Sequence, residues 1–174
     1  RSNGKLTMPD NDYQLGLYKQ TINLLKKNGF HHYEISNFAL PGKECKHNIT
    51  YWQNTDTLGL GAGASSFMSG VRFKNTNLPA HYIRNVQKNR MSIESCESLK
   101  SREAMGETIM LGLRLLKGIN IGKFEDRFQI SFNSIFGNII AILKEKELIV
   151  VEHGQLRLSG KGLFLADSVI LEFI

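Results

Sequence analysis

Apolar positions near the N-terminus of the chain recur at helical spacing. One stripe joins residues that lie three or four positions apart: Leu15, Tyr18, Ile22 and Leu25. Asp10 or Asp12 can cap the start of this helix, and Asn28-Gly29 ends it. Residues 30–35 then have the composition of a short strand. The succession of helix, glycine turn and strand predicts half of an α/β repeat, in which the strand ends at the ligand face.

The middle of the chain has shorter and less regular signals. A polar loop is expected over residues 37–55, and a short strand over residues 57–60 leads into a group of glycines. Residues 67–73 predict a further strand, and residues 80–87 predict a short amphipathic helix. The first half of the chain is therefore expected to be an α/β region.

The second half of the chain begins after a polar, aperiodic stretch at residues 88–98. Such a stretch indicates a domain boundary, and we place the first domain at residues 1–90 and the second at residues 91–174. Ser98 or Ser101 then begins a strong helix. Its apolar face comprises Met105, Ile109, Gly112/Leu113 and Leu116.

The remaining elements of the second domain follow in a recognisable order. They are a β-like segment at residues 119–121, helices at about 122–128 and 132–146, a β-hairpin at 148–158, and a last helix from Ser159 to Leu171. The longer helix is expected to bury its apolar face: Phe132, Ile135, Phe136, Ile139, Ile140 and Leu143. Three helices, a β-wing and a final helix predict a winged-helix domain.

The outer face of residues 132–146 decides whether such a domain reads DNA. A recognition helix presents Arg, Lys, Asn or Gln to the major groove. The outward positions hold one cation beside one anion and no arginine: Asn133, Ser134, Gly137, Asn138, Ala141, Lys144 and Glu145. The net charge of +6 is also spread along the chain rather than gathered in one basic run. We therefore expect no nucleic-acid binding and favour a packing or lid role.

Composition narrows the class of protein further. Of the 174 residues, 41% are hydrophobic and 22% are charged, which is typical of a globular protein. No apolar run reaches the roughly 20 residues of a membrane span, and the N-terminus has no signal-peptide core. The chain begins without Met, so we expect a piece of a longer protein. Cys45 and Cys96 cannot form a disulfide framework, which favours the reducing cytoplasm.

A glycine turn at residues 58–66 is the first candidate binding feature. Without Cβ atoms, backbone can approach a ligand closely, and its free N–H groups can hold a carboxylate or phosphate. The turn lacks the spacing and the following helix of a dinucleotide fingerprint, so we exclude that class of site. A tight corner of a barrel remains the structural alternative.

The polar segment before the glycines is the second candidate feature. Cys45 and His47 suggest a metal, but a structural zinc site needs four such ligands, and the nearby histidines do not supply a convincing set. His47 is better explained as a loop hydrogen-bonding residue or as a pocket residue that meets a substrate carboxylate. Tyr51 and Trp52 can stack on a flat ring or plug the barrel mouth.

Taken together, these segments resemble a known family. The residues that carry the resemblance are Tyr33-Glu34-Ile35-Ser36-Asn37-Phe38-Ala39, Pro41-Gly42, Glu44-Cys45, His47-Asn48, Tyr51-Trp52, Leu58-Gly59-Leu60-Gly61-Ala62-Gly63-Ala64, Leu113-Arg114, Lys117-Gly118-Ile119, Leu158-Ser159 and Lys161-Gly162. They are similar to the oxygen-independent coproporphyrinogen III oxidase family of radical S-adenosylmethionine (SAM) proteins. Within that family, these motifs are most similar to those of the heme-chaperone-like branch.

The resemblance implies a fold, cofactors and a site. The first domain would be the C-terminal βα units of a partial TIM-like barrel, and a winged-helix-like domain would follow. The parent protein would carry a [4Fe-4S] cluster and SAM, and would bind a porphyrin or heme. The SAM-side loop would be Gly61, Gly63, Ala64, Ser65 and Ser66, and the substrate pocket would be lined or braced by Glu34, Asn37, His47, Asn48 and Tyr51.

Two departures from the family pattern limit what this chain can do. The family's cluster loop is Cys-x-x-x-Cys-x-x-Cys, and no such triplet is present, so the N-terminal half of the barrel is expected to be missing. We therefore expect the chain alone to be inactive and to have no cluster. The chaperone-like branch commonly has a histidine after Gly-Ala-Gly-Ala, where this chain has Ser65, which cannot ligate heme iron.

These observations lead to two hypotheses of different classes. The first is the C-terminal part of a radical SAM protein that binds heme for delivery or, as the less favoured activity, oxidatively decarboxylates coproporphyrinogen. The alternative is a winged-helix binding module for nucleic acid or a protein partner.

Overall fold

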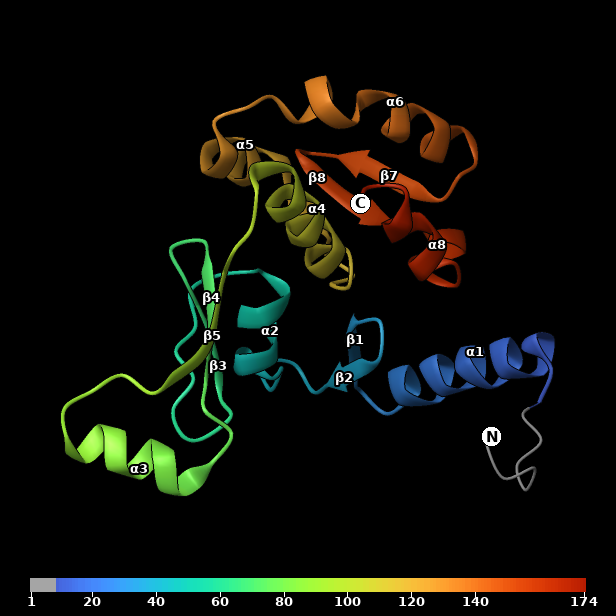
Figure 1. Cartoon of the computed structure of the whole chain (residues 1–174). Coiled ribbons are helices and arrows are strands. Elements are labelled where there is room, and N and C mark those ends of the chain that lie inside the picture. The colour runs from blue at the N-terminus through green and yellow to red at the C-terminus, as the bar shows by residue number, and fades with distance from the viewer. Residues whose placement is uncertain (1–8) are drawn as a thin grey trace. The chain divides into compact units, whose positions relative to one another are not determined.

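The structure is a computed structural model that describes residues 9–174 (Figure 1). It has a mixed α/β composition, as expected from the sequence. The chain divides into two compact units, one that ends at Cys45 and one from Lys46 to Ile174. Every strand pair among the described residues is antiparallel.

The first unit consists of a helix and a small hairpin. Helix α1 (Asn11–Lys27) begins where the Asp10 side chain accepts a hydrogen bond from the Tyr13 N–H at 2.7 Å, as the sequence predicts. None of its residues is fully buried, and the predicted apolar stripe is half-buried. Strand β1 (His31–Glu34) also forms where expected, but it pairs with β2 (Asn37–Ala39), which lies inside the expected loop.

The second unit begins with a helix that periodicity did not indicate. Helix α2 (Lys46–Trp52) is short and lies within the segment expected to be a polar loop. The residues at 57–60 are not a strand, since only Thr57 forms an isolated bridge, with Phe67. The expected strand at 67–73 is instead a hairpin of β3 (Ser65–Met68) and β4 (Val71–Asn75), which turns at Ser69-Gly70.

A third strand completes this sheet. Helix α3 (Pro79–Gln87) forms as predicted and is followed by β5 (Ile93–Ser98), which gives the strand order β3-β4-β5. The polar stretch at residues 88–98 therefore holds a sheet strand rather than an unstructured connection. All six residues of β5 are exposed, so backbone pairing with β4 holds this strand in place rather than burial.

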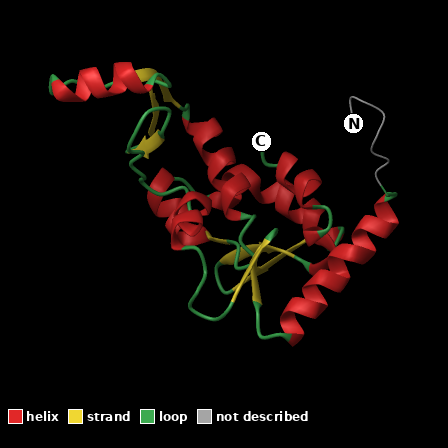
Figure 2. Cartoon of the chain, turned by 90° about the horizontal axis from the view of Figure 1, so that it is seen from below, coloured by secondary structure: helices red, strands yellow, loops and turns green. Residues whose placement is uncertain are grey.

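The C-terminal elements follow the predicted order closely. Figure 2 shows the helices and strands of the chain in different colours. The C-terminal elements are α4 (Ser101–Gly112), β6 (Ile119–Asn120), α5 (Ile121–Phe128), α6 (Phe132–Glu145), β7 (Ile149–Glu152), β8 (Gln155–Leu158), α7 (Gly160–Leu163) and α8 (Ala166–Leu171). The strands form one sheet in the order β6-β8-β7, and the hairpin turns at His153-Gly154 with both φ angles positive. The expected last helix is divided into α7 and α8.

A cluster of phenylalanine rings forms the core of these elements. The rings of Phe124, Phe132, Phe136 and Phe173 are nearly or completely buried, and neighbouring centroids lie 4.8 to 6.1 Å apart. The rings come from α5, α6 and the residues after α8, so this cluster joins three parts of the domain. The prediction that α6 turns Phe132, Phe136 and Leu143 inward is confirmed.

The end of α6 is tied to the start of α7. The hydroxyl of Ser159 donates to the carbonyl of Glu147 at 2.6 Å, and the Ser159 N–H donates to the carbonyl of Leu148 at 3.0 Å. The Lys161 ammonium donates to the carbonyl of Lys146 at 3.0 Å. The Lys161 bond satisfies the carbonyl of Lys146, the C-cap of α6, and the two Ser159 bonds satisfy carbonyls of the connection between α6 and β7. They also bring Gly162 against the Leu148 carbonyl, where a side chain has no room.

Two further findings concern the cysteines and the helices. Both cysteines, Cys45 and Cys96, are free and exposed. Among the described helices, none combines the length and the apolar character that crossing a bilayer requires.

Candidate functional site

The backbone of the glycine turn is hydrogen-bonded internally. The N–H of Gly59 donates to the Ser66 hydroxyl at 2.9 Å, and that of Gly61 donates to the Tyr82 hydroxyl at 3.1 Å. The N–H of Gly63 donates to the Thr76 carbonyl at 2.8 Å. The interpretation of these amides as free donors for an anion is therefore wrong, because each already has an acceptor.

Asn75 fixes the shape of the same turn from β4. Its buried side-chain amide donates to the carbonyls of Gly59 and Gly61, at 3.2 and 2.9 Å. Gly61 has φ +106°, and a Cβ added to it would meet no atom within 4 Å. The turn is thus held from inside by side chains and open on the outside at Gly61, where only glycine adopts this backbone without strain. After Ala64, Ser65 is exposed and Ser66 is buried.

Three of the predicted pocket residues lie together on α2. The rings of His47 and Tyr51 meet edge to face, with centroids 4.8 Å apart and an interplanar angle of 89°. Both side chains are exposed, and Asn48 is half-buried. This helix presents an imidazole and a phenol next to each other at its surface, because positions i and i+4 share one face.

The other two predicted pocket residues lie in the first unit. Glu34 is completely buried, and its carboxylate accepts bonds from the Ser36 N–H at 2.9 Å and from the Asn37 side-chain amide at 2.5 Å. Burial, and secondarily the charge of Glu34, raises the pKa of Tyr18. In this unit Glu34 therefore braces the turn between β1 and β2. The structure brings Glu34 and Asn37 together in the first unit, and His47 and Tyr51 together on α2 in the second.

The described residues do not supply ligands for an iron–sulfur cluster. No group of three or more Cys, His, Asp or Glu side chains within residues 9–174 could hold a metal ion. A [4Fe-4S] cluster is held by several thiolates, and Cys45 and Cys96 do not form such a set.

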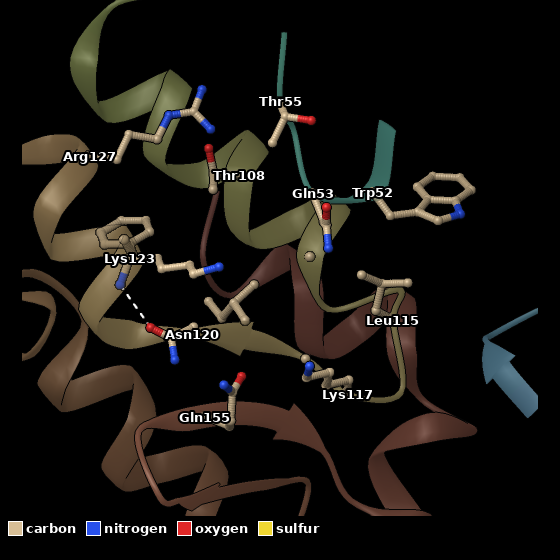
Figure 3. A pocket seen from close by; sticks show the side chains of 14 residues that line it. Trp52, Gln53, Thr55, Thr108, Leu115, Lys117, Asn120, Lys123, Arg127 and Gln155 are labelled. Atoms are coloured by element: carbon tan, nitrogen blue, oxygen red, sulfur yellow. Dashed lines mark hydrogen bonds between the residues drawn. The ribbon is translucent and has the colours of Figure 1, made fainter. Parts of the chain in front are cut away.

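Sequence reasoning missed a pocket of about 460 Å³ in the second unit (Figure 3). Its walls come from the end of α2 and the loop after it, from α4 and the loop after it, and from β6, α5 and β8. Polar side chains around it include Lys117, Asn120, Lys123 and Gln155. In the sequence, Lys117-Gly118 stands out only as part of the family resemblance. No local pattern indicates a pocket that residues from five separate elements enclose.

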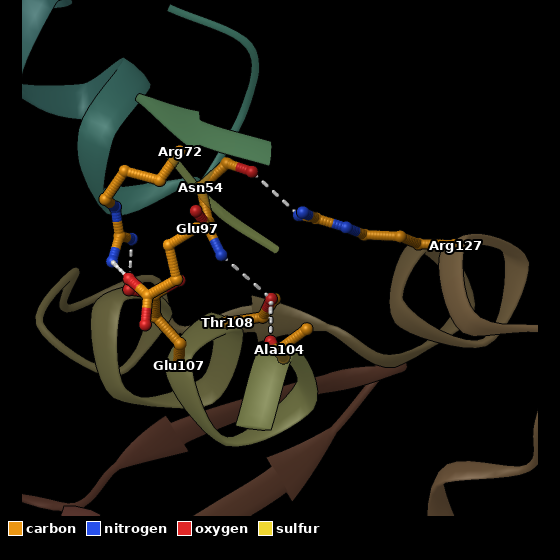
Figure 4. Close-up of polar contacts among 7 residues, drawn as sticks. All are labelled: Asn54, Arg72, Glu97, Ala104, Glu107, Thr108 and Arg127. Carbon is orange, nitrogen blue, oxygen red and sulfur yellow. Dashed lines mark hydrogen bonds and ion pairs between the residues drawn. The ribbon is translucent and has the colours of Figure 1, made fainter. Parts of the chain in front are cut away.

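A polar network joins the loop after α2 to α4 and α5 (Figure 4). The buried Asn54 amide donates to the Thr108 hydroxyl at 3.0 Å, and the Arg127 guanidinium donates to the Asn54 carbonyl at 2.7 Å. Nearby, Arg72 on β4 pairs with Glu107 on α4. The two bonds of Asn54 join residues that are 54 and 73 positions apart along the chain, and the Arg72–Glu107 pair joins residues 35 positions apart.

Replacing Asn54 tests this network. Asn54 has φ +49°, a left-handed backbone that asparagine tolerates better than alanine, so Asn54→Ala strains the backbone and also removes the bond to Thr108. We expect the free energy of unfolding to fall by about 2–3 kcal/mol. Asn54→Gly removes the bond but accepts the backbone angle, so it should cost about half as much. Urea unfolding of both variants gives the two values, and equal losses would contradict the backbone contribution.

Three comparisons place the chain among known proteins. The model of the HemN C-terminal domain family matches residues 99–165. The chain is 37% identical to the heme chaperone HemW of Lactococcus lactis over 171 residues, which are 98% of this chain and 45% of the relative. It is 31% identical to the Bacillus subtilis heme chaperone HemW over the same shares of both chains. The chain belongs to the HemN/HemW family of radical SAM proteins.

Within the HemN/HemW family, the chain corresponds to the C-terminal part and spans less than half the length of these relatives. A solved structure of the Escherichia coli coproporphyrinogen III oxidase HemN, described as a radical SAM enzyme, has the same fold. The TM-score is 0.69 at 18% identity, over 95% of this chain and 42% of the HemN chain. The resemblance that the sequence motifs indicated is thereby confirmed.

Proposed function

We propose that this chain is the C-terminal part of a heme-binding radical SAM protein that acts as a heme chaperone. The observation that carries the proposal is the 37% identity to a protein named heme chaperone HemW along 98% of the chain. We also propose the cytoplasm as its compartment, because both cysteines are free and exposed. The oxidase activity is less favoured, since the likeness to HemN at 18% identity supports the fold alone.

The domain organisation is part of the same proposal. Residues 1–90 would complete a TIM-like barrel whose other βα units lie elsewhere in the parent protein. Residues 91–174 would be a winged-helix-like domain, supported by the order α4, β6, α5, α6, β7, β8. Its role would be packing rather than DNA binding, since the exposed residues of α6 include Lys144 beside Glu145 and no arginine.

The proposal divides the cofactors between the two parts of the parent. Cluster ligands would come from outside this chain, because the described residues hold no suitable set. Within the glycine turn, the segment from Gly61 to Ser66 would form the wall that contacts SAM. The ligand would approach the backbone most closely at Gly61, where an added Cβ would meet no atom. When bound, SAM and the cluster supply radical chemistry. The contribution of this chain would be to shape the mouth of the site.

The chemistry of heme ligation points to α2. Heme iron in proteins is held by His, Cys, Met or Tyr side chains. Ser65 has no such group, whereas His47 is an exposed imidazole beside the exposed Tyr51. A flat ring bound at the surface of α2 could therefore meet a nitrogen ligand and an aromatic edge. We assign His47 as the proposed axial ligand within this chain.

A heme titration of the full chain tests the assignment. Wild-type chain is expected to shift and sharpen the Soret band of ferric heme, and His47→Ala should weaken binding by about tenfold or more. His81→Ala is the matched control, because His81 is an exposed histidine on α3. It should bind heme like the wild type.

The outcomes separate the function from the ligand. If wild-type chain causes no Soret shift, the proposed heme function is wrong for this part of the parent. If His47→Ala gives the wild-type spectrum and affinity, heme binding stands but His47 is not the ligand. Equal losses for the His47 and His81 variants would indicate non-specific histidine contacts.

A further inference from the structure

The pocket formed by α2, α4, β6, α5 and β8 is lined by positive but not by negative side chains. Its fourteen lining residues include three cations, Lys117, Lys123 and Arg127, and no aspartate or glutamate. Among the described residues, neither Lys117 nor Lys123 forms an ion pair. Two unneutralised ammonium groups at one opening create a positive potential that attracts anions.

Arg127 contributes less to that potential than the two lysines. Its guanidinium donates to the Asn54 carbonyl at 2.7 Å and is therefore partly used in holding the fold. Burial lowers the pKa of Arg127, while the nearby carboxylates of Asp56 and Glu107 act in the opposite direction and balance part of its charge. The available positive charge thus lies with Lys117 and Lys123.

Neutral hydrogen-bond donors and a helix N-terminus also favour an anionic ligand at this pocket. The side chains of Asn120 and Gln155 lie around the opening with the lysines (Figure 3). Asn120 also caps the N-terminus of α5, where its side-chain oxygen accepts from the Lys123 N–H at 2.8 Å. The positive end of the helix dipole therefore faces the same region as the two ammonium groups.

The remaining walls are partly polar, at Gln53, Thr55 and Thr108, and partly apolar. Leu115, Ile119 and Phe124 line the pocket, together with the backbone of Gly112 and Gly118. Trp52 also contributes to the wall, and the Arg114 guanidinium packs over its ring at 4.5 Å. A volume of about 460 Å³ lies in the range of small-molecule sites. An inorganic anion would leave these apolar walls unused.

We propose that this pocket binds an organic anion in which one or more carboxylates are attached to an apolar body. Lys117 and Lys123 hold the carboxylate, Asn120 and Gln155 donate to it, and Leu115, Ile119 and Phe124 contact the apolar body. This site is separate from the heme proposal, because no residue of the glycine turn lines it, and neither His47 nor Tyr51 does. Two sources share this chemistry: a small aromatic acid, or a carboxylate at the edge of a tetrapyrrole.

Fluorescence of Trp52 gives a direct readout, because it is the only tryptophan of the chain and it lines the pocket. Full chain is titrated with 2-naphthoate and, separately, with the neutral analogue 2-naphthamide, and isothermal calorimetry gives the affinities. Naphthoate should bind at least about tenfold more tightly than naphthamide, and the difference should shrink at high salt.

Single substitutions then test whether Lys117 and Lys123 bind the carboxylate. Lys117→Gln and Lys123→Gln should each weaken naphthoate binding by about three- to tenfold, without changing the affinity for naphthamide. Lys144→Gln is the matched control, because Lys144 is exposed on α6 and lies outside the pocket. Far-UV circular dichroism and the Tm confirm that each variant is folded.

Each outcome decides the proposal. Equal affinity for naphthoate and naphthamide, no naphthoate binding at millimolar concentration, or wild-type affinity in both lysine variants would overturn it. If the expected selectivity is found, heme is added as a competitor. Displacement of naphthoate by heme identifies a tetrapyrrole carboxylate as the source, and simultaneous binding identifies a separate small acid. If the chain binds naphthoate but not heme, the proposed heme function is wrong and the proposed anion pocket stands.

Discussion

Gly162→Ala is expected to destabilise the unit from Lys46 to Ile174 by about 3 kcal/mol or more. A Cβ at position 162 would lie 1.8 Å from the carbonyl oxygen of Leu148, and this contact is with backbone rather than a movable side chain. The clash can be relieved only if α7 moves away from the end of α6. That movement would also break the bonds from Ser159 to the carbonyls of Glu147 and Leu148.

Gly160→Ala is the matched control for this variant. Gly160 lies two positions earlier in the same helix, and a Cβ added there would meet nothing within 4 Å. Alanine has the higher helix propensity, so Gly160→Ala should be neutral or stabilising by up to about 1 kcal/mol. Urea unfolding followed by circular dichroism gives both values. Similar stabilities for the two variants would show that α7 does not approach Leu148 as closely as described.

Phe136→Ala is expected to cost about 3–5 kcal/mol of unfolding free energy. The Phe136 ring has no exposed surface and contacts three other rings, with centroids 5.1 Å away at Phe132, 5.6 Å at Phe173 and 6.1 Å at Phe124. Its removal leaves a cavity in the centre of the core, because surrounding rings from three elements cannot all close in.

Ile142→Ala provides the comparison on the same helix. Ile142 lies on α6 but is 49% exposed, so its truncation should cost less than about 1 kcal/mol. Thermal unfolding of the two variants measures the difference between their losses of stability. Phe and Ile have similar helix propensities, so the change to Ala affects the helix itself about equally in both. A small loss for Phe136→Ala would mean that the aromatic cluster does not form the core.

The elements that the sequence predicted best are those with strong local signals. Helix α1 has both an apolar stripe and a side-chain cap at Asp10, and α6 repeats apolar residues over 14 positions. Helix α2 was missed because seven residues with mixed polarity show no helical period. Strand β5 was missed for a related reason, since an exposed edge strand has no buried face to produce alternation.

For the candidate site, the sequence indicated which residues belong to it but not which partners they contact. The glycines at 59–63 were recognised from composition, but the partners of their amides come from residues 7 to 21 positions further along the chain. Composition cannot tell whether such partners are present. The pocket with Lys117 and Lys123 depends on the same kind of distant contact, since residues from Trp52 to Gln155 enclose it.

The braced glycine turn has a consequence for the cost of molecular recognition. Asn75 holds two of its carbonyls and Tyr82 holds the Gly61 amide before any ligand arrives. Binding of a partner to this turn would carry little cost in conformational entropy, because the loop is already ordered in the folded chain. Loosening the brace would therefore raise the entropic penalty of association, while leaving every atom that touches the partner unchanged.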